Sequence, residues 1–169
     1  MQLTRAADYG VRVMVELAGM PEGDRTSLQF LTQGTGAPES FLSKVLQALT
    51  RVGFINSWRG QGGGFEISTS GRGASMRAVI EAIDGPIALN VCLADGKECR
   101  RSAVCPAHPV WAKAQQAMLA VLDDARICDL AQVGLSAGAA ESATLPIFVQ
   151  TGSIMPARDA VESETQPVL

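Results

Sequence analysis

A glycine-rich, cationic loop at residues 59–64 most constrains the fold of this 169-residue chain. The loop reads RGQGGG and lies between two strand-like stretches, residues 54–58 and 65–68. Glycine adopts backbone conformations that other residues avoid, so this composition favours a tight reversal of the chain between two antiparallel strands. We therefore expect a small β-hairpin in a chain whose other segments show helical periodicity.

Three amphipathic helical patterns precede the hairpin. Thr4 is a suitable N-cap for the first pattern, and Thr26 or Ser27 can begin a short second one. Residues 34–37 have the composition of a tight turn, and Pro38 then occupies a favoured first position of the third helix. Two short helices joined by a glycine-containing turn are the outline of a helix-turn-helix. The apolar positions that recur at three- and four-residue steps are Ala7, Val11, Met14, Leu17 and Ala18 in the first helix, Leu28 and Leu31 in the second, and Phe41, Leu42, Val45, Leu46 and Leu49 in the third.

The helix-turn-helix and the hairpin that follows it predict a winged helix-turn-helix over residues 1–85. This region ends with an expected helix over residues 75–83, and a long helix is expected over residues 106–122. The apolar stripe of the long helix, which includes Val110 and Trp111, needs a partner, and a second subunit is one candidate. The expected fold class is therefore mostly α with a small β-hairpin wing: a winged helix-turn-helix plus a long dimerisation helix.

The chain divides into four parts by pattern and composition. The winged helix-turn-helix covers residues 1–85, a cysteine-containing loop covers residues 86–105, and residues 106–133 hold the dimerisation helix and a short following segment. Residues 134–169 are rich in Gly, Pro, Ser, Thr and Ala and are interpreted as a flexible acidic tail. The one apolar patch of this tail is at residues 145–149.

The net charge of −3, taken alone, argues mildly against a nucleic-acid partner. The charge is unevenly distributed, however, because residues 134–169 carry one basic and four acidic residues while the rest of the chain is balanced. The sequence contains no run of about 18 apolar residues, and its N-terminus lacks the pattern of a secretory signal. We therefore expect no membrane partner and a cytoplasmic location.

Polar positions near the start of the third helix predict a DNA-binding face. Ser40, Lys44 and Gln47 can reach base edges or phosphates when such a helix enters the major groove. Arg59 can contact phosphate or enter a narrow minor groove, and Gln61 lies beside it in the same loop. From the start of this helix to the end of the loop, three basic residues stand against one acidic residue, so the face is locally positive. The alternative is a plain hairpin turn, with Lys44 as a solvated surface charge.

Three cysteines lie close together in the sequence: Cys92, Cys99 and Cys105, with His108 three residues further on. In a chain without a secretion signal, this spacing favours metal ligands over disulfides. Thiolates with a histidine suit zinc, and thiolates also hold iron–sulfur clusters, so both cofactors remain open. The alternative is a set of free surface thiols. Cys128 stands apart and is expected to be a small buried residue.

Several motifs occur together in one order along residues 1–133. They are Leu3-Thr4, Asp8-Tyr9 and Arg12 in the first helix, residues 38–42 with Lys44 and Leu49 in the third, residues 57–65 in the hairpin loop, residues 79–85, and the three neighbouring cysteines. On these motifs the chain resembles the Rrf-type winged-helix regulators, which include IscR, NsrR and RirA. The segment at residues 57–65 is the most specific part of the resemblance.

The resemblance implies a homodimeric bacterial transcription factor whose long C-terminal helix forms the dimer. In such proteins each subunit holds an iron–sulfur cluster near the winged helix of its partner. Cys92, Cys99 and Cys105 match the three cysteine ligands, although six residues separate the first two where five are common in the family. The fourth ligand differs among members. Asp8, supplied by the other subunit, is favoured here and His108 is the alternative, so the cluster type, 4Fe–4S or 2Fe–2S, stays open.

We therefore expect a homodimeric DNA-binding transcription regulator that acts as a repressor on double-stranded operator DNA. It would sense nitric oxide, redox state or iron through an iron–sulfur cluster. The alternative is a zinc-stabilised winged-helix DNA-binding protein without a sensor cluster. An enzyme is not expected, because the chain has no C-x-x-C motif and no clear pair of base and nucleophile.

Overall fold

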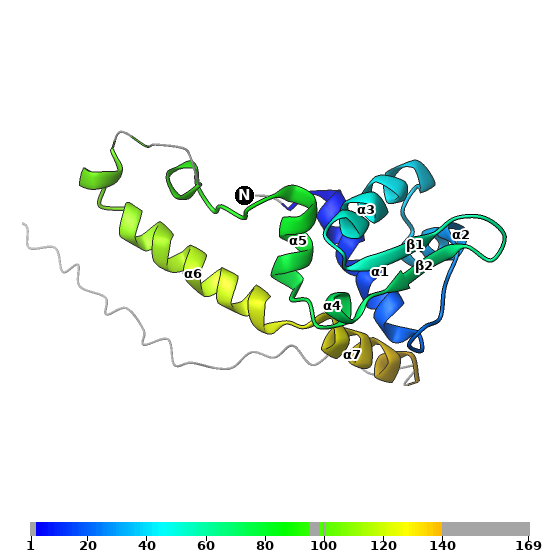
Figure 1. The fold of residues 1–169 in the computed structure, drawn as a ribbon. Coiled ribbons are helices and arrows are strands. Elements are labelled where there is room, and N and C mark those ends of the chain that lie inside the picture. The colour runs from blue at the N-terminus through cyan, green and yellow to red at the C-terminus, as the bar shows by residue number, and fades with distance from the viewer. Residues whose placement is uncertain (1–2, 95–98, 100, 140–169) are drawn as a thin grey trace, which may run out of the picture.

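The computed structural model describes residues 3–94, 99 and 101–139 of the chain (Figure 1). Within these residues the elements are helices and one two-stranded antiparallel sheet, which confirms the expected fold class. Helix α6 extends away from the group formed by the other helices and the hairpin (Figure 1). The elements in chain order are α1 (Arg5–Gly19), α2 (Leu28–Thr35), α3 (Glu39–Arg51), β1 (Ile55–Trp58), β2 (Gly64–Ile67), α4 (Thr69–Arg72), α5 (Met76–Asp84), two short 3-10 turns (Val91–Leu93 and Ser102–Val104), α6 (His108–Asp124) and α7 (Ile127–Ala139).

Polar N-caps start the first helices where the sequence predicts them. Thr4 Oγ1 accepts a hydrogen bond from the Ala7 N–H at 3.2 Å, and Ser27 caps α2 in the same way. Gly36 ends α2 with a φ of 68°, the left-handed conformation that glycine favours in a turn. Pro38 is the N-cap of α3 and not its first helical residue, a shift of one position. Gly34 and Thr35, expected in the turn, are the last residues of α2, so local sequence signals place the helix-turn-helix to within two residues.

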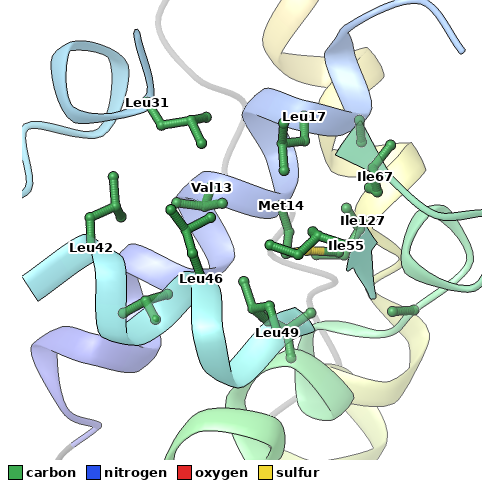
Figure 2. Packing of buried hydrophobic residues seen from close by; sticks show 14 of the residues in the cluster. Val13, Met14, Leu17, Leu31, Leu42, Leu46, Leu49, Ile55, Ile67 and Ile127 are labelled. Carbon is green, nitrogen blue, oxygen red and sulfur yellow. The ribbon is translucent and has the colours of Figure 1, made fainter. Parts of the chain in front are cut away.

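Helix α1 is the centre of the hydrophobic core and packs against α2, α3, α5 and α7; Figure 2 shows the buried side chains of this cluster. The side chain of Ile83 from α5 occupies the space beside Gly10, because a Cβ at this position would overlap Cδ1 of Ile83. Phe41 was expected to belong to the core, but it is 38 % exposed and contacts the ring of Tyr9 edge-on at the border of the cluster. Burial of each large apolar side chain contributes about 1.5–3 kcal/mol. The largest fully buried side chains are Met14, Leu17, Leu31, Leu42, Leu46, Leu49, Ile55, Ile80, Ile127, Val13, Val45 and Val79.

The predicted hairpin is present, and we refer to β1, β2 and the loop at residues 59–63 as the wing. Ile55 lies opposite Ile67, and Trp58 lies opposite Gly64 at the other end of the ladder. Ile55 and Ile67 are buried, so the base of the wing belongs to the core. The loop lies at the end of the structure opposite to α6 (Figure 1).

The C-terminal part of the fold differs from the expectation. Helix α6 ends at Asp124, and the chain turns back so that α7 packs against α1. Ile127 and Ala131 of α7 are buried in the core. Helix α7 continues through Ala139, so residues 134–139 are helical where composition indicates a tail. The helix forms there because α7 packs against α1, a tertiary contact that composition alone does not predict.

Cys128 is half-buried, where the sequence predicted a buried residue, because its neighbour Ile127 takes the inward position. The rest of the predicted tail, residues 140–169 with the apolar patch at residues 145–149, lies outside the described residues. Within the described ranges, no helix combines the length and apolar character needed to cross a membrane.

The buried contact between α7 and α1 can be tested by truncating Ile127. Ile127 is fully buried, so we expect Ile127→Ala to lower the free energy of unfolding by about 2–5 kcal/mol. Val133 lies on the same helix and is 61 % exposed, so Val133→Ala should change that free energy by no more than about 0.5 kcal/mol. Urea unfolding followed by circular dichroism measures both. Equal losses for the two variants would contradict the docking of α7 on the core.

Candidate nucleic-acid interface and metal-ligand residues

Helix α3 presents one polar face to solvent. Ser40, Lys44, Gln47 and Arg51 follow one another at steps of three or four residues, and all four are exposed. The opposite side of α3 is buried in the core, which fixes the direction of the polar face. The structure therefore places the three predicted α3 contacts on one surface and adds Arg51 to them. Its position four residues after Gln47 is the sequence signal that could have identified it.

A groove of about 530 Å³ runs between α3 and the wing. Ser43, Gln47 and Arg51 line it from α3, and Ser57 and Arg59 line it from the wing. Hydroxyl, amide and guanidinium groups are among the donors that proteins use to hold phosphate oxygens. The arrangement thus offers donors from two separate elements to one stretch of a nucleic-acid backbone.

The other predicted contacts lie outside this groove. Lys44, although on the exposed face of α3, borders a separate pocket of about 200 Å³ that Ala6 and Phe41 also line. Ser40 and Gln61 are exposed and line neither pocket. The structure therefore gathers two of the five predicted contacts in one groove and places the other three elsewhere on the exposed surface.

The positive charges of this face are not neutralised by the part of the chain that the structure describes. There, Lys44, Arg51 and Arg59 form no ion pair within 4.0 Å. Exposed cations without a protein partner attract phosphate and make the affinity for nucleic acid dependent on salt. The net negative charge of the chain therefore does not describe this face.

All four cysteines lie within the described residues, and none forms a disulfide. Cys92 sits in the first 3-10 turn, and Cys105 directly follows the second. The carbonyl of Cys99 accepts hydrogen bonds from the N–H and the hydroxyl of Ser102 at 3.0 and 2.9 Å. All three cysteine residues are half-buried. Local backbone bonds thus shape this segment, and the thiols are not consumed by a crosslink.

The described residues of one protomer do not assemble a metal site, because no three of their His, Cys, Asp and Glu side chains are close enough to hold one ion. Asp8 is exposed at the start of α1 and forms an ion pair with Arg12 at 2.9 Å. Nδ1 of His108 is buried and has no hydrogen-bond partner. Three free thiols with a carboxylate or an imidazole fit an iron–sulfur cluster, or zinc, by the chemistry of the donors. Within a single protomer the geometry does not yet bring these donors together.

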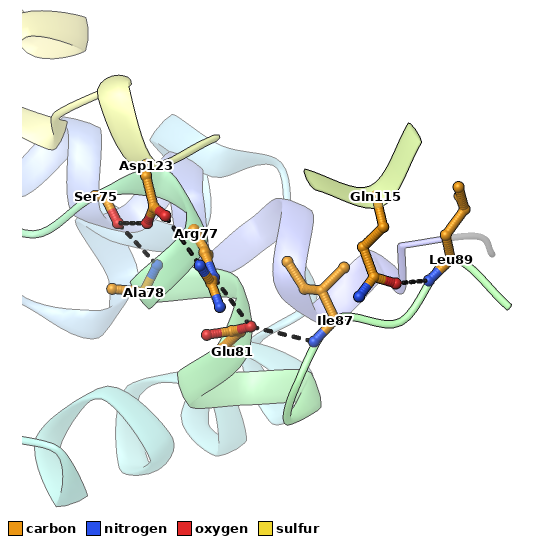
Figure 3. A network of polar contacts seen from close by, with 8 residues as sticks. All are labelled: Ser75, Arg77, Ala78, Glu81, Ile87, Leu89, Gln115 and Asp123. Carbon is orange, nitrogen blue, oxygen red and sulfur yellow. Dashed lines mark hydrogen bonds and ion pairs between the residues drawn. The ribbon is translucent and has the colours of Figure 1, made fainter. Parts of the chain in front are cut away.

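A polar network ties α6 and the cysteine segment, residues 86–105, to helix α5 (Figure 3). Arg77 of α5 donates hydrogen bonds to Asp123 of α6 at 2.9 Å and to Glu81 at 3.2 Å. Both bonds raise the pKa of the Arg77 guanidinium above its usual value, and the bond to Asp123 has the larger effect. The guanidinium therefore stays charged. Glu81 in turn accepts a hydrogen bond from the N–H of Ile87 at 3.2 Å. The start of the cysteine segment is thus anchored on the winged helix.

Two further contacts extend this anchor. Gln115 of α6 accepts a hydrogen bond from the N–H of Leu89 at 2.8 Å (Figure 3). Ile87 is buried in a small apolar cluster with Ala7 of α1 and Ile80 of α5. Ile87 and Leu89 thus contact α1, α5 and α6, and both α1 and α5 pack in turn against α3.

A recognition helix, a cationic wing and a shared groove define a protein of the winged helix-turn-helix class. A comparison with protein families matches residues 3–133 to Rrf2, described as an iron-dependent transcriptional regulator. The chain belongs to the Rrf2 family. It is therefore a transcription regulator of a DNA-binding family and not an enzyme.

Solved structures support the same fold. CymR (YrzC), described as the global cysteine regulator of B. subtilis, is 26 % identical with a TM-score of 0.64, over 79 % of this chain and 98 % of that one. Staphylococcus aureus CymR is 24 % identical with a TM-score of 0.60, over 76 % of this chain and 96 % of that one. IscR of T. potens is 21 % identical with a TM-score of 0.66, over 84 % of this chain and 94 % of that one. The chain thus spans nearly the whole length of each.

The groove can be tested through Arg51. Removing one phosphate contact should weaken binding to mixed-sequence duplex DNA and reduce the slope of log affinity against log salt by about one. We expect this for Arg51→Ala, measured by fluorescence anisotropy over a salt series. Lys113→Ala removes one exposed cation from α6, away from the groove, and should leave the slope unchanged. Equal slopes for Arg51→Ala and the unmodified protein would contradict the assignment.

Proposed function

We propose that this protein is a homodimeric transcription regulator that represses by binding double-stranded operator DNA. Ser40, Lys44 and Gln47 of α3 would contact the major groove, and Arg59 and Gln61 of the wing would contact the adjacent backbone or minor groove. The observation that carries this proposal is the groove between α3 and the wing, which Gln47 and Arg59 line together. Among the described residues, Arg59 has no ion pair that would neutralise its charge. Family membership supports DNA as the ligand.

The exposed apolar side chains of α6 support the homodimer. Val110 is 67 % exposed, Trp111 42 % and Val121 69 %, and no residue of α6 is buried. Large apolar side chains exposed along one helix are typical of a surface that meets another protein. A second copy of α6 is the proposed partner. Dimers of this class read two half-sites whose spacing is set by protein geometry.

We further propose that Cys92, Cys99 and Cys105 hold an iron–sulfur cluster, with Asp8 of the second subunit as the fourth ligand. The three cysteines are free and half-buried, and the family is described as iron-dependent. Asp8 is exposed, and its ion pair with Arg12 lies at the surface and contributes little to stability. The carboxylate is therefore available to another protomer. The buried, unpartnered Nδ1 of His108 supports that residue as the alternative. When bound, such a cluster supplies a centre that reacts with oxygen or nitric oxide and depends on iron supply.

The contacts of the cysteine segment supply a route from this site to DNA. Ile87 lies between α1 and α5, and Glu81 and Gln115 accept hydrogen bonds from the N–H groups of Ile87 and Leu89. A shift of this segment would alter its packing against α1 and α5, which also support α3. Because half-site spacing is a strict geometric requirement, a small change in the relation of the two recognition helices would release the operator.

The cluster assignment can be tested with two cysteine variants. We expect the anaerobically purified protein to contain iron and sulfide and to absorb visible light, and Cys99→Ser to lose all three while remaining folded. Cys128→Ser is the matched control and should retain them, because Cys128 lies on α7 and outside the proposed ligand set. A colourless protein with stoichiometric zinc would instead indicate the zinc-stabilised alternative. Unchanged absorbance in Cys99→Ser would refute the ligand set.

The fourth ligand can be assigned by comparing three further variants. We expect Asp8→Ala to change the visible spectrum and to lower the iron retained after anaerobic gel filtration, because a ligand is lost. His108→Ala should leave both unchanged. Arg12→Ala breaks the ion pair of Asp8 but keeps the carboxylate, and so controls for local charge. A spectrum altered by His108→Ala and not by Asp8→Ala would overturn the choice of Asp8.

A further inference from the structure

We propose that Arg25 is a positioning residue for DNA binding: it stacks on Trp58 and pairs with Glu66, and thereby holds the wing so that Arg59 meets the DNA backbone. This inference rests on the proposed contact between Arg59 and DNA. Arg25 lies in the connection between α1 and α2, outside both elements that line the groove.

The register of the wing separates its side chains into two faces. Side chains alternate along a strand, and the buried pair of Ile55 and Ile67 marks the face that meets the core. Trp58 and Glu66 therefore belong to the opposite, outer face. Trp58 is 37 % exposed, and its cross-strand partner Gly64 offers no side chain to cover it. An isolated two-stranded hairpin is marginally stable in water, so its outer face benefits from a cover.

Arg25 provides this cover. Its guanidinium carbon lies 3.9 Å from the centroid of the Trp58 ring, well inside the range of a cation–π contact. Its Nε lies 3.8 Å from Oε2 of Glu66, at the outer limit of an ion pair. The stack on Trp58 is the stronger contact, since an ion pair that is partly exposed and this long contributes little.

The backbone beside Arg25 is joined to the same strand. Thr26 and Phe65 exchange two hydrogen bonds, with the Thr26 N–H donating at 2.9 Å and the Phe65 N–H donating at 2.8 Å. Gly64 permits this approach, because a Cβ there would lie 2.6 Å from the carbonyl oxygen of Thr26. Side chain and backbone thus fasten the connection before α2 to both strands of the wing.

The charge of Arg25 is already engaged by an aromatic face and a carboxylate. Arg59 directly follows Trp58 in the chain and has no ion pair among the described residues. Fixing Trp58 therefore restricts where Arg59 can point before DNA arrives, and preorganisation of this kind raises affinity without a new contact. Arg25 thus favours DNA binding by orienting the wing, and it does not itself contact a phosphate group of the DNA.

A double-mutant cycle tests this role with the full-length protein and a labelled duplex of mixed sequence. Arg25→Ala removes one cation–π contact, so we expect this variant to bind the duplex about fivefold more weakly than the unmodified protein. If Arg25 acts through Arg59, the double variant Arg25→Ala/Arg59→Ala should bind no more weakly than Arg59→Ala alone. Additive losses would show that Arg25 contacts DNA itself and would overturn the proposal.

A spectroscopic readout reports the stack without DNA. The chain has two tryptophans, so Trp111→Phe leaves Trp58 as the sole indole emitter. In that background we expect Arg25→Ala to increase the quenching of Trp58 by acrylamide, with the helical circular dichroism unchanged. Unchanged quenching would overturn the stack.

The same variants separate this inference from the proposed function. If Arg59→Ala weakens binding and Arg25→Ala does not, the positioning role fails while the wing contact stands. If Arg59→Ala binds DNA as tightly as the unmodified protein, the proposed wing contact fails and the positioning role fails with it.

Discussion

The packing of helix α1 is the constraint on which the rest of the structure depends. Its buried residues pack against α3 on one side and α7 on another, and Ile83 of α5 fills the space beside Gly10. The exposed side of the same helix carries Asp8, the proposed fourth ligand of the cluster. One helix therefore joins the element that would read DNA to the surface that would meet the partner's cysteine segment. A change at either site must pass through a rigid, fully packed element, in which side chains have little room to adjust.

Features governed by neighbouring residues could be predicted from the sequence. Thr4 and Ser27 cap their helices as expected, and the glycine-rich loop forms the wing between strands that differ from the expected ones by a residue. Features that depend on distant contacts could not. The packing of α7 on α1 has no local signal, and neither does the stacking of Arg25 on Trp58, whose residues lie far apart in the chain.

The candidate sites follow the same division. The exposed stripe of α3 could be predicted because helix periodicity decides which residues share a face, yet only the structure shows that Gln47 and Arg59 line one groove. The cysteine spacing predicts the donors. It does not predict their assembly, and the described residues of one protomer do not form a group able to hold a metal. Under the proposal, the site is completed by a second subunit, so dimer formation and cofactor binding support each other.

If the cysteine site regulates the protein, its affinity for DNA must depend on the state of that site, and one measurement tests this dependence. The full-length protein is purified anaerobically, and its affinity for a duplex selected from random sequence is compared before and after treatment with nitric oxide or an iron chelator. Coupled sites typically change affinity by about 5- to 150-fold, so we expect a change within that range, and none for Cys99→Ser treated alike. Equal affinities of the unmodified protein before and after treatment, with its iron demonstrably altered or lost, would contradict the account.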